Sequence, residues 1–181
     1  MKSYEYARRN GIQEISWERF AEMSARLTEA LAKQQINMVI GVARAGLFPA
    51  TAVACALRCE LNPVRVTRRV DDRVTFEGPI WRVDAPSTVS GQRVAVIDEI
   101  ADSGETLALV ATRVLERRAR QVVTASLVSH SWADPRPDLT ALTSDALIIF
   151  PWDQRVFADG KWLPHPEIAA AIKAQSSRPN G

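Results

Sequence analysis

Two adjacent acids, Asp98 and Glu99, end a short apolar run and stand just before a small polar turn. Carboxylates in such a place accept hydrogen bonds from the hydroxyl groups of a sugar or hold a hard cation such as Mg²⁺. The turn offers backbone N–H groups and hydroxyls directly before an expected helix N-terminus, which suits a phosphate. The predicted phosphate-binding residues are Asp102, Ser103, Gly104, Glu105 and Thr106. Together these groups predict a site for a sugar phosphate whose charge a cation helps to neutralise.

The segments on either side explain how these groups are positioned. Residues 94–97 are apolar and mostly β-branched, which is typical of a strand buried on both faces in a parallel sheet. The acids then fall at the carboxyl end of that strand, where open α/β sheets place their ligands. After the turn, apolar side chains recur with helical spacing and predict one buried helix face: Leu107, Val110, Ala111, Val114 and Leu115.

A second turn, earlier in the chain, has a similar design. An apolar run at residues 37–42 precedes it, and a helix is expected after it to about residue 58, with Pro49 in the first turn. The turn consists of Ala43, Arg44, Ala45 and Gly46. A strand, a small-residue turn with one arginine and a helix N-terminus make an anion site. Alone this motif is weakly specific, and its position upstream of the acid pair strengthens it.

Both segments resemble patterns of a known family. Residues 94–107 resemble the 5-phosphoribosyl-1-pyrophosphate (PRPP) signature of the type I phosphoribosyltransferases, which has an apolar strand, two acids, two variable residues, then an acid, Thr or Ser, Gly, any residue and Thr. Glu99 is the only departure, at a position where Asp is usual. Residues 43–46 resemble the family's pyrophosphate-binding loop, in which the peptide before the basic residue is often cis. Here that peptide joins Ala43 to Arg44.

The resemblance implies transfer of the phosphoribosyl group of PRPP to a nucleobase, with release of pyrophosphate. Asp98 and Glu99 would hold the ribose hydroxyls directly or through Mg²⁺, residues 102–106 the 5-phosphate, and residues 43–46 the pyrophosphate. Asp102 would act as the catalytic residue by accepting the proton of the base. Such a reaction depends on positioning and on charge stabilisation. An Mg²⁺-dependent phosphoribosyltransferase is therefore expected.

The C-terminal part is similar to the purine branch of that family, whose members act on xanthine, guanine and hypoxanthine. There a strand ends in a Lys that donates to the purine 6-oxo group, and a later aromatic–apolar pair precedes Pro-Trp and an acid. This chain has His130 in place of the Lys and Leu147 in place of a stacking Trp. The implied base-binding residues are His130, Leu147, Ile148, Trp152 and Asp153, and Asp153 is also a candidate metal ligand beside Asp98 and Glu99.

Two of these residues have simpler interpretations that stay open. His130 is equally well read as an exposed loop residue without a role, and Trp152 as ordinary core packing. The two departures leave a pocket for a flat ring possible but weaken the case for ordinary 6-oxopurine specificity. Leu covers a base face less completely than Trp, and a neutral His donates only one hydrogen bond per tautomer. We therefore expect a purine as the acceptor and leave its identity open.

The fold class that follows is α/β, with a doubly wound and mostly parallel sheet flanked by helices. Further strands are expected at residues 63–67, 121–128 and 145–150, and Ser16 is expected to cap a helix that runs to about residue 33. A turn with Pro135 and Pro137 is expected after the strand at 121–128, and residues 154–164 are expected to be a loop. One domain, residues 1–181, is expected, with a core at about 35–130 and a small hood from about 1–15 and 131–165.

Residues 68–90 form a long polar segment, which inside a compact domain is usually functional or mobile. In the family it resembles, a loop at this place closes over the reacting centre and excludes water. Arg68, Arg69 and Arg73 either meet the pyrophosphate or lie on a solvated hairpin, and both interpretations stay open.

Composition narrows the class of protein. With 181 residues and a net charge of +2, the chain is long enough for a core and too weakly charged to predict binding to nucleic acid or membranes. Its two cysteines, Cys55 and Cys59, are expected to be small core residues in a reducing compartment rather than a disulfide. We expect a cytoplasmic protein. By analogy with the family, we also expect it to form a homodimer or homotetramer.

Two other functions stay open at this point. Some members of this fold bind PRPP but regulate nucleotide synthesis without catalysis, and the two departures at the base end favour that alternative. Against it, the chain has no basic run that would bind nucleic acid. A doubly wound domain that binds another mononucleotide would keep the phosphate turn without needing Asp98 and Glu99.

Overall fold

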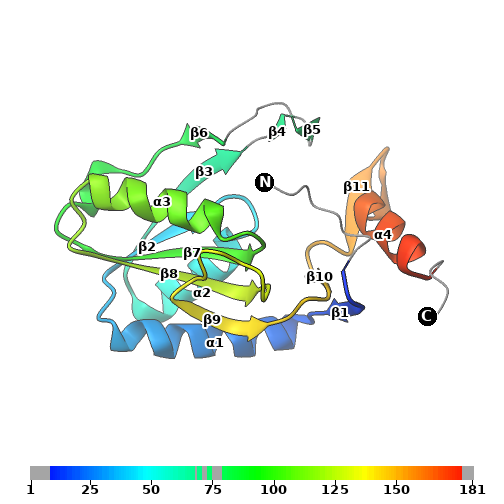
Figure 1. The fold of residues 1–181 in the computed structure, drawn as a ribbon, viewed down its shortest axis with the longest axis horizontal. Coiled ribbons are helices and arrows are strands. Elements are labelled where there is room, and N and C mark those ends of the chain that lie inside the picture. The colour runs from blue at the N-terminus through cyan, green and yellow to red at the C-terminus, as the bar shows by residue number, and fades with distance from the viewer. Residues whose placement is uncertain (1–8, 68, 71–72, 75–78, 177–181) are drawn as a thin grey trace. The chain divides into compact units, whose positions relative to one another are not determined.

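A computed structural model describes residues 9–67, 69–70, 73–74 and 79–176 (Figure 1). These residues fall into two compact units, each of which is described by itself. The sheet unit is Glu22–Thr143. The terminal unit joins the described residues up to Ala21 with those from Ser144 onward. Within the described ranges, no helix combines the length and the apolar character needed to cross a membrane.

A six-stranded sheet forms the centre of the sheet unit. Its strand order is β6 (Ile80–Val83), β3 (Glu60–Thr67), β2 (Met38–Val42), β7 (Arg93–Ala101), β8 (Gln121–Ser129) and β9 (Leu139–Thr143). All neighbouring pairs are parallel except β3 and β6, which are antiparallel. The predicted α/β fold with a mostly parallel sheet is therefore confirmed.

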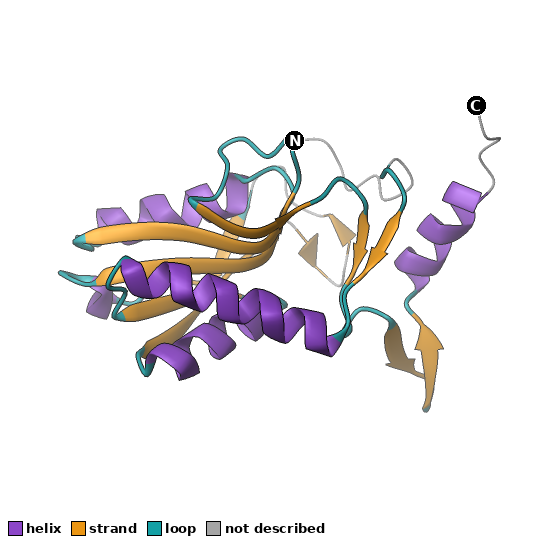
Figure 2. Cartoon of the chain, turned by 90° about the horizontal axis from the view of Figure 1, so that it is seen from below, coloured by secondary structure: helices purple, strands orange, loops and turns teal. Residues whose placement is uncertain are grey.

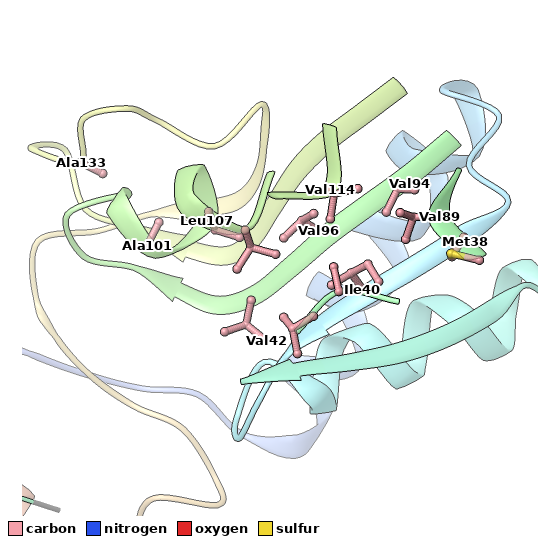
Figure 3. Close-up of a cluster of buried hydrophobic side chains, with 13 residues drawn as sticks. Met38, Ile40, Val42, Val89, Val94, Val96, Ala101, Leu107, Val114 and Ala133 are labelled. Carbon is pink, nitrogen blue, oxygen red and sulfur yellow. The ribbon is translucent and has the colours of Figure 1, made fainter. Parts of the chain in front are cut away.

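Alternate residues of the central strands face opposite sides of the sheet. Val94 and Val96 of β7 pack with α3 (Glu105–Glu116), whereas Ala95 and Ile97 pack with α1 (Trp17–Lys33) and α2 (Leu47–Leu57). Helices thus lie on both faces of the sheet (Figure 2), and Figure 3 shows the first of the two clusters. Because both faces are buried, the strands read as continuous apolar runs, which is why they were visible in the sequence.

Most elements of the sheet unit agree with their predicted places. The strands expected at residues 37–42, 63–67 and 121–128 are β2, β3 and β8, and residues 94–97 lie within β7. Ser16 caps α1 as predicted, since its Oγ accepts the backbone N–H of Arg19 at 3.1 Å. The core position expected for Cys55 is wrong: it is exposed, because α2 buries the opposite face, and Cys59 is half-buried.

One strand was not predicted and one loop prediction is wrong. The turn with Pro135 and Pro137 follows β8 as predicted, and the edge strand β9 after it was not predicted, since its half-buried residues carry a weaker apolar signal than a central strand. Residues 154–164, expected as a loop, contain the antiparallel hairpin β11 (Arg155–Ala158) and β12 (Lys161–Pro164). Its turn is Asp159-Gly160, both with positive φ, at 51° and 74°. This Asp-Gly pair is a strong local hairpin signal that the sequence prediction missed.

The terminal unit is built from short elements. Strand β1 (Ile12–Glu14) pairs in parallel with β10 (Leu147–Ile149), which lies within the strand expected at 145–150. Helix α4 (Pro166–Ser176) packs on β10 through Ala171 and Ile172. The hood was predicted at about 1–15 and 131–165, whereas this unit takes in the described residues up to Ala21 and from Ser144 onward, including α4. Residues 139–143 belong instead to the six-stranded sheet.

The polar segment at 68–90 contains β4 (Arg69–Val70) and β5 (Arg73–Val74), which pair antiparallel, then β6 and a 3-10 turn, η2 (Ser87–Val89). Arg68 lies outside the described residues, as do the side chains of Arg69 and Arg73. Their contact with pyrophosphate therefore stays a prediction.

Candidate functional site

Three loops follow neighbouring parallel strands and meet at the carboxyl-terminal edge of the sheet, where these strands end. They are the pyrophosphate loop (residues 43–46) after β2, the phosphate loop (residues 102–106) after β7, and the loop at residues 130–135 after β8, called the brace loop below. The chain runs from β2 outward to β3 on one side and from β7 to β8 on the other. The carboxyl ends of β2 and β7 thus flank the switch point at which open α/β sheets bind ligands.

The acid pair lies inside β7, two and three residues before the strand ends at Ala101. Asp98 and Glu99 are both partly exposed as whole residues, although the carboxyl group of Asp98 itself is shielded from water. The backbone N–H of Glu99 donates to Oδ1 of Asp98 at 2.9 Å. Burial raises the pKa of the Asp98 carboxyl well above its ordinary value, and the nearby charge of Glu99 and a hydrogen bond from its side chain add to this. A bound cation would oppose both effects by stabilising the ionised form.

The pyrophosphate loop packs directly against this pair. A Cβ added at Gly46 would lie 2.7 Å from Oδ1 of Asp98 and 2.5 Å from the carbonyl oxygen of Val42. Only glycine lets the loop and the carboxylate approach so closely. The peptide between Ala43 and Arg44 is cis, as the resemblance implied, and the Arg44 side chain is exposed.

The phosphate loop leads into the N-terminus of α3. Gly104 has φ of +84°, a conformation that favours glycine, and is the N-cap of the helix. Ser103 Oγ accepts the N–H of Glu105 at 3.3 Å, and Glu105 and Thr106 are exposed. No side chain in the described ranges caps the helix at Gly104. The amide N–H groups of this first turn suit an anion, since helix N-termini leave such donors over.

The brace loop holds the phosphate loop residue by residue. The N–H of His130 donates to the Ala101 carbonyl at 3.1 Å, and the N–H of Asp134 donates to the Ser103 carbonyl at 2.9 Å. Pro135, which follows a cis peptide, covers Gly104: a Cβ there would lie 1.9 Å from the Pro135 carbonyl oxygen. The position of the phosphate loop therefore depends on a segment some thirty residues later in the chain.

Asp102, the predicted proton acceptor, contacts two rings of the brace loop. Trp132 Nε1 lies 3.3 Å from Oδ1 of Asp102 and donates to it. His130 Nε2 lies 3.9 Å from the same oxygen. The two rings stack with centroids 4.4 Å apart and an interplanar angle of 15°. His130 is 2% exposed and Trp132 is 46% exposed, so His130 is not the exposed loop residue of the simpler interpretation.

The other base-binding candidates lie in the terminal unit. Leu147 and Ile148 are buried in β10. Trp152 stacks on Phe150 with centroids 4.8 Å apart, and meets Phe20 edge-on at 5.5 Å. Asp153 is partly exposed, and its N–H donates to the Phe150 carbonyl at 3.0 Å. Because these residues are described only within their own unit, their contact with a base or a metal stays a prediction.

The carboxylates of Asp98 and Glu99 suit an Mg²⁺ ion that binds together with the substrate. In the described part of the chain, no three His, Cys, Asp or Glu side chains form a closed metal cluster. Asp98 and Glu99 supply adjacent carboxylates at the open edge of the sheet. Mg²⁺ is commonly held by one or two carboxylates, with substrate phosphates and water filling the other positions. The pair thus fits such an ion, and does not fit a metal that needs a full cage of side chains.

Sequence reasoning missed two residues of this site. Trp132 and Pro135 were read only as parts of a turn, although both follow β8 directly at the edge where the ligand loops meet. An aromatic side chain three residues after the carboxyl end of a strand beside the switch point was the available signal. Its partner, Asp102, is thirty residues away, and only the folded chain identifies it.

Comparisons with known proteins agree with this geometry. A family model described as a phosphoribosyl transferase domain matches residues 12–157. A xanthine-guanine phosphoribosyltransferase from Cereibacter sphaeroides is 28% identical over 156 residues, which cover 77% of this chain and 85% of that protein. A protein of the same name from Idiomarina loihiensis is 25% identical over 144 residues, which cover 78% and 87%. The purine phosphoribosyltransferase of Pyrococcus horikoshii has the same fold, with a TM-score of 0.72 and 24% identity over 82% of this chain and 98% of that one.

Proposed function

Because the chain belongs to the phosphoribosyltransferase family, we propose that it is an enzyme that transfers the 5-phosphoribosyl group of PRPP to a purine base and releases pyrophosphate. The observation that carries this proposal is the contact of Gly46 with Asp98, which brings a pyrophosphate loop against a ribose-binding acid. The purine acceptor is supported by the names of the relatives from Cereibacter and Idiomarina. They do not favour a purely regulatory role.

Each loop has one task in the reaction. The amides of the phosphate loop hold the 5-phosphate, and Arg44 with its neighbouring amides holds the pyrophosphate as it leaves C1 of the ribose. Asp98 and Glu99 accept hydrogen bonds from the ribose hydroxyls and would hold Mg²⁺. When bound, Mg²⁺ would neutralise charge on the pyrophosphate and on the acid pair. Asp102 accepts the proton that the attacking base must lose.

A homodimer or homotetramer is proposed by analogy with the family. The cytoplasm is proposed as the compartment, and the free state of Cys55 and Cys59 is consistent with reducing conditions. Binding to nucleic acid or to membranes is not proposed, since the net charge is only +2.

A panel of bases tests the activity and its acceptor together. Pyrophosphate release from PRPP is measured with guanine, xanthine, hypoxanthine, adenine and uracil, each with Mg²⁺ and with EDTA. We expect turnover with at least one 6-oxopurine, none with uracil, and loss of turnover in EDTA. Binding of PRPP without turnover on any base would disprove the enzymatic function. Turnover that persists in EDTA would disprove the Mg²⁺ requirement.

The proton-accepting role of Asp102 predicts the effect of one isosteric substitution. Asp102→Asn should lower kcat on an accepted base by roughly a hundredfold, because a positioned general base contributes on the order of 10²–10⁴-fold. Asp84→Asn is the matched control, since Asp84 follows the antiparallel β6 and pairs with Arg117 at 2.7 Å, away from the ligand loops. If Asp102→Asn keeps the turnover of the wild type, the role is wrong.

A further inference from the structure

The contact between Trp132 and Asp102 has no place in the reaction as proposed so far. Trp132 Nε1–H donates to Oδ1 of Asp102, and the indole plane is fixed by its stack on His130. The stack has one buried and one half-exposed member, since His130 is 2% and Trp132 46% exposed. An indole held in this way presents its only donor to one carboxylate oxygen in a fixed direction.

The backbone around these side chains makes the arrangement rigid. The brace loop is tied to the phosphate loop through the hydrogen bonds to the carbonyls of Ala101 and Ser103, one on each side of Asp102. The N–H of Ala133 also donates to the His130 carbonyl at 3.1 Å, which closes a tight turn around Trp132. Trp132 is therefore attached to a segment that cannot shift without moving the phosphate loop as well.

We propose that Trp132 is a positioning residue for phosphoribosyl transfer, which orients the Asp102 carboxylate so that it can accept the proton of the base. This inference rests on the proposed function. In this inference Trp132 and not His130 faces the base, because Trp132 is the exposed ring of the stack and His130 is the buried one. A hydrogen bond from a fixed donor selects one orientation of the Asp102 carboxylate. Catalytic efficiency depends on such orientation.

Trp132→Phe separates the hydrogen bond from the packing, because Phe retains an aromatic ring for the stack on His130 and has no N–H. We expect kcat to fall on the order of tenfold, the scale of one hydrogen bond to a charged group. The KM for PRPP should change by less than about twofold, since the residue does not contact the phosphate in this proposal. The matched control is Trp162→Phe in the hairpin of the terminal unit, where the ring is 59% exposed and packs on Phe157. That control should leave kcat unchanged.

A double-mutant cycle tests whether Trp132 acts through Asp102. In an Asp102→Asn background, Trp132→Phe should change kcat by less than about twofold, because coupled residues are not additive. An unchanged kcat for Trp132→Phe in the wild-type background overturns the inference, and so does an equal fold-loss in both backgrounds. A wild-type chain without turnover on any base would instead overturn the proposed function itself. The two failures are therefore distinguishable.

Discussion

The pyrophosphate loop and the phosphate loop lie side by side at one edge of the sheet, yet they are held by different parts of the chain. The pyrophosphate loop is held by near neighbours in sequence and by β3. Gly46 lies against the Val42 carbonyl, the N–H of Leu47 donates to the Arg44 carbonyl at 3.1 Å, and the N–H of Ala43 donates to the Val64 carbonyl at 2.7 Å. Asp98 of β7 also lies against Gly46. The phosphate loop is held from outside, by the brace loop that follows β8.

The difference also appears in the two glycines. Gly46 has φ of −60°, which any residue adopts, so its glycine is required by space alone. Gly104 has φ of +84° and also lies under Pro135, so its glycine is required by both conformation and space. Gly104 should therefore be more sensitive to substitution than Gly46, because a side chain there strains its own backbone and also displaces Pro135 of the brace loop.

Gly104→Ala should have the largest effect. A side chain at a positive φ costs about 1–3 kcal/mol, and the clash with the Pro135 carbonyl adds about 1–3 kcal/mol as overpacking. The free energy of unfolding, measured with urea, should fall on the order of 3 kcal/mol. The catalytic efficiency for PRPP should fall at least about a hundredfold, because a misplacement near 1 Å has that cost.

Gly91→Ala provides the matched control for that substitution. Gly91 has φ of +76°, and a Cβ there would have no neighbour within 4 Å. The free energy of unfolding of Gly91→Ala should therefore fall by only about 1–2 kcal/mol, the cost of a side chain at a positive φ. Its turnover should equal that of the wild type. Equal losses of stability for Gly91→Ala and Gly104→Ala would show that the brace loop yields freely and does not hold the phosphate loop.

Gly46→Ala should be milder for stability and still severe for activity. Its φ is compatible with Ala, so the cost is the crowding against Val42 and Asp98, about 1–3 kcal/mol. The KM for PRPP should rise by roughly tenfold or more, because the methyl group displaces either the pyrophosphate loop or the Asp98 carboxylate. Steady-state kinetics over a range of PRPP concentrations measures this.

A cap substitution shows whether lost stability alone explains such a change. Ser16→Ala removes the side chain that caps α1 and should cost about 1 kcal/mol. Its KM for PRPP should equal that of the wild type. If Ser16→Ala raises the KM as much as Gly46→Ala does, the effect at Gly46 is one of stability and not of the contact with Asp98.

The smallest expected effect is the pH dependence that Asp98 contributes. Its folded pKa is raised, so its contribution to stability is fully present below the ordinary pKa of Asp, about 3.9, and is lost as the pH rises through the raised value. Without metal or PRPP, the Tm of the wild type should therefore decline over this window more than that of Asp98→Asn. Parallel Tm curves for the two proteins would contradict a raised pKa.

Sequence patterns predicted the sheet unit well for a physical reason. Strands β2, β7 and β8 are buried on both faces, and the segments after β2 and β7 carry loop chemistry that is local in sequence. Burial of β9 is partial and its signal correspondingly weak, so it was missed. The hairpin at β11 and β12 was not predicted, although its Asp-Gly turn is a signal that is local in sequence.

The sequence by itself determined the family resemblance, the parallel α/β sheet, the acid pair and the two anion loops, because each depends on residues that are close together along the chain. It also indicated the cis bond before Arg44 through that resemblance. Only the tertiary structure decided that Gly46 rests on Asp98, that Pro135 covers Gly104, and that Trp132 donates to Asp102. These contacts join segments about thirty to fifty residues apart, and their distances are fixed by strand register and packing, which no local pattern encodes.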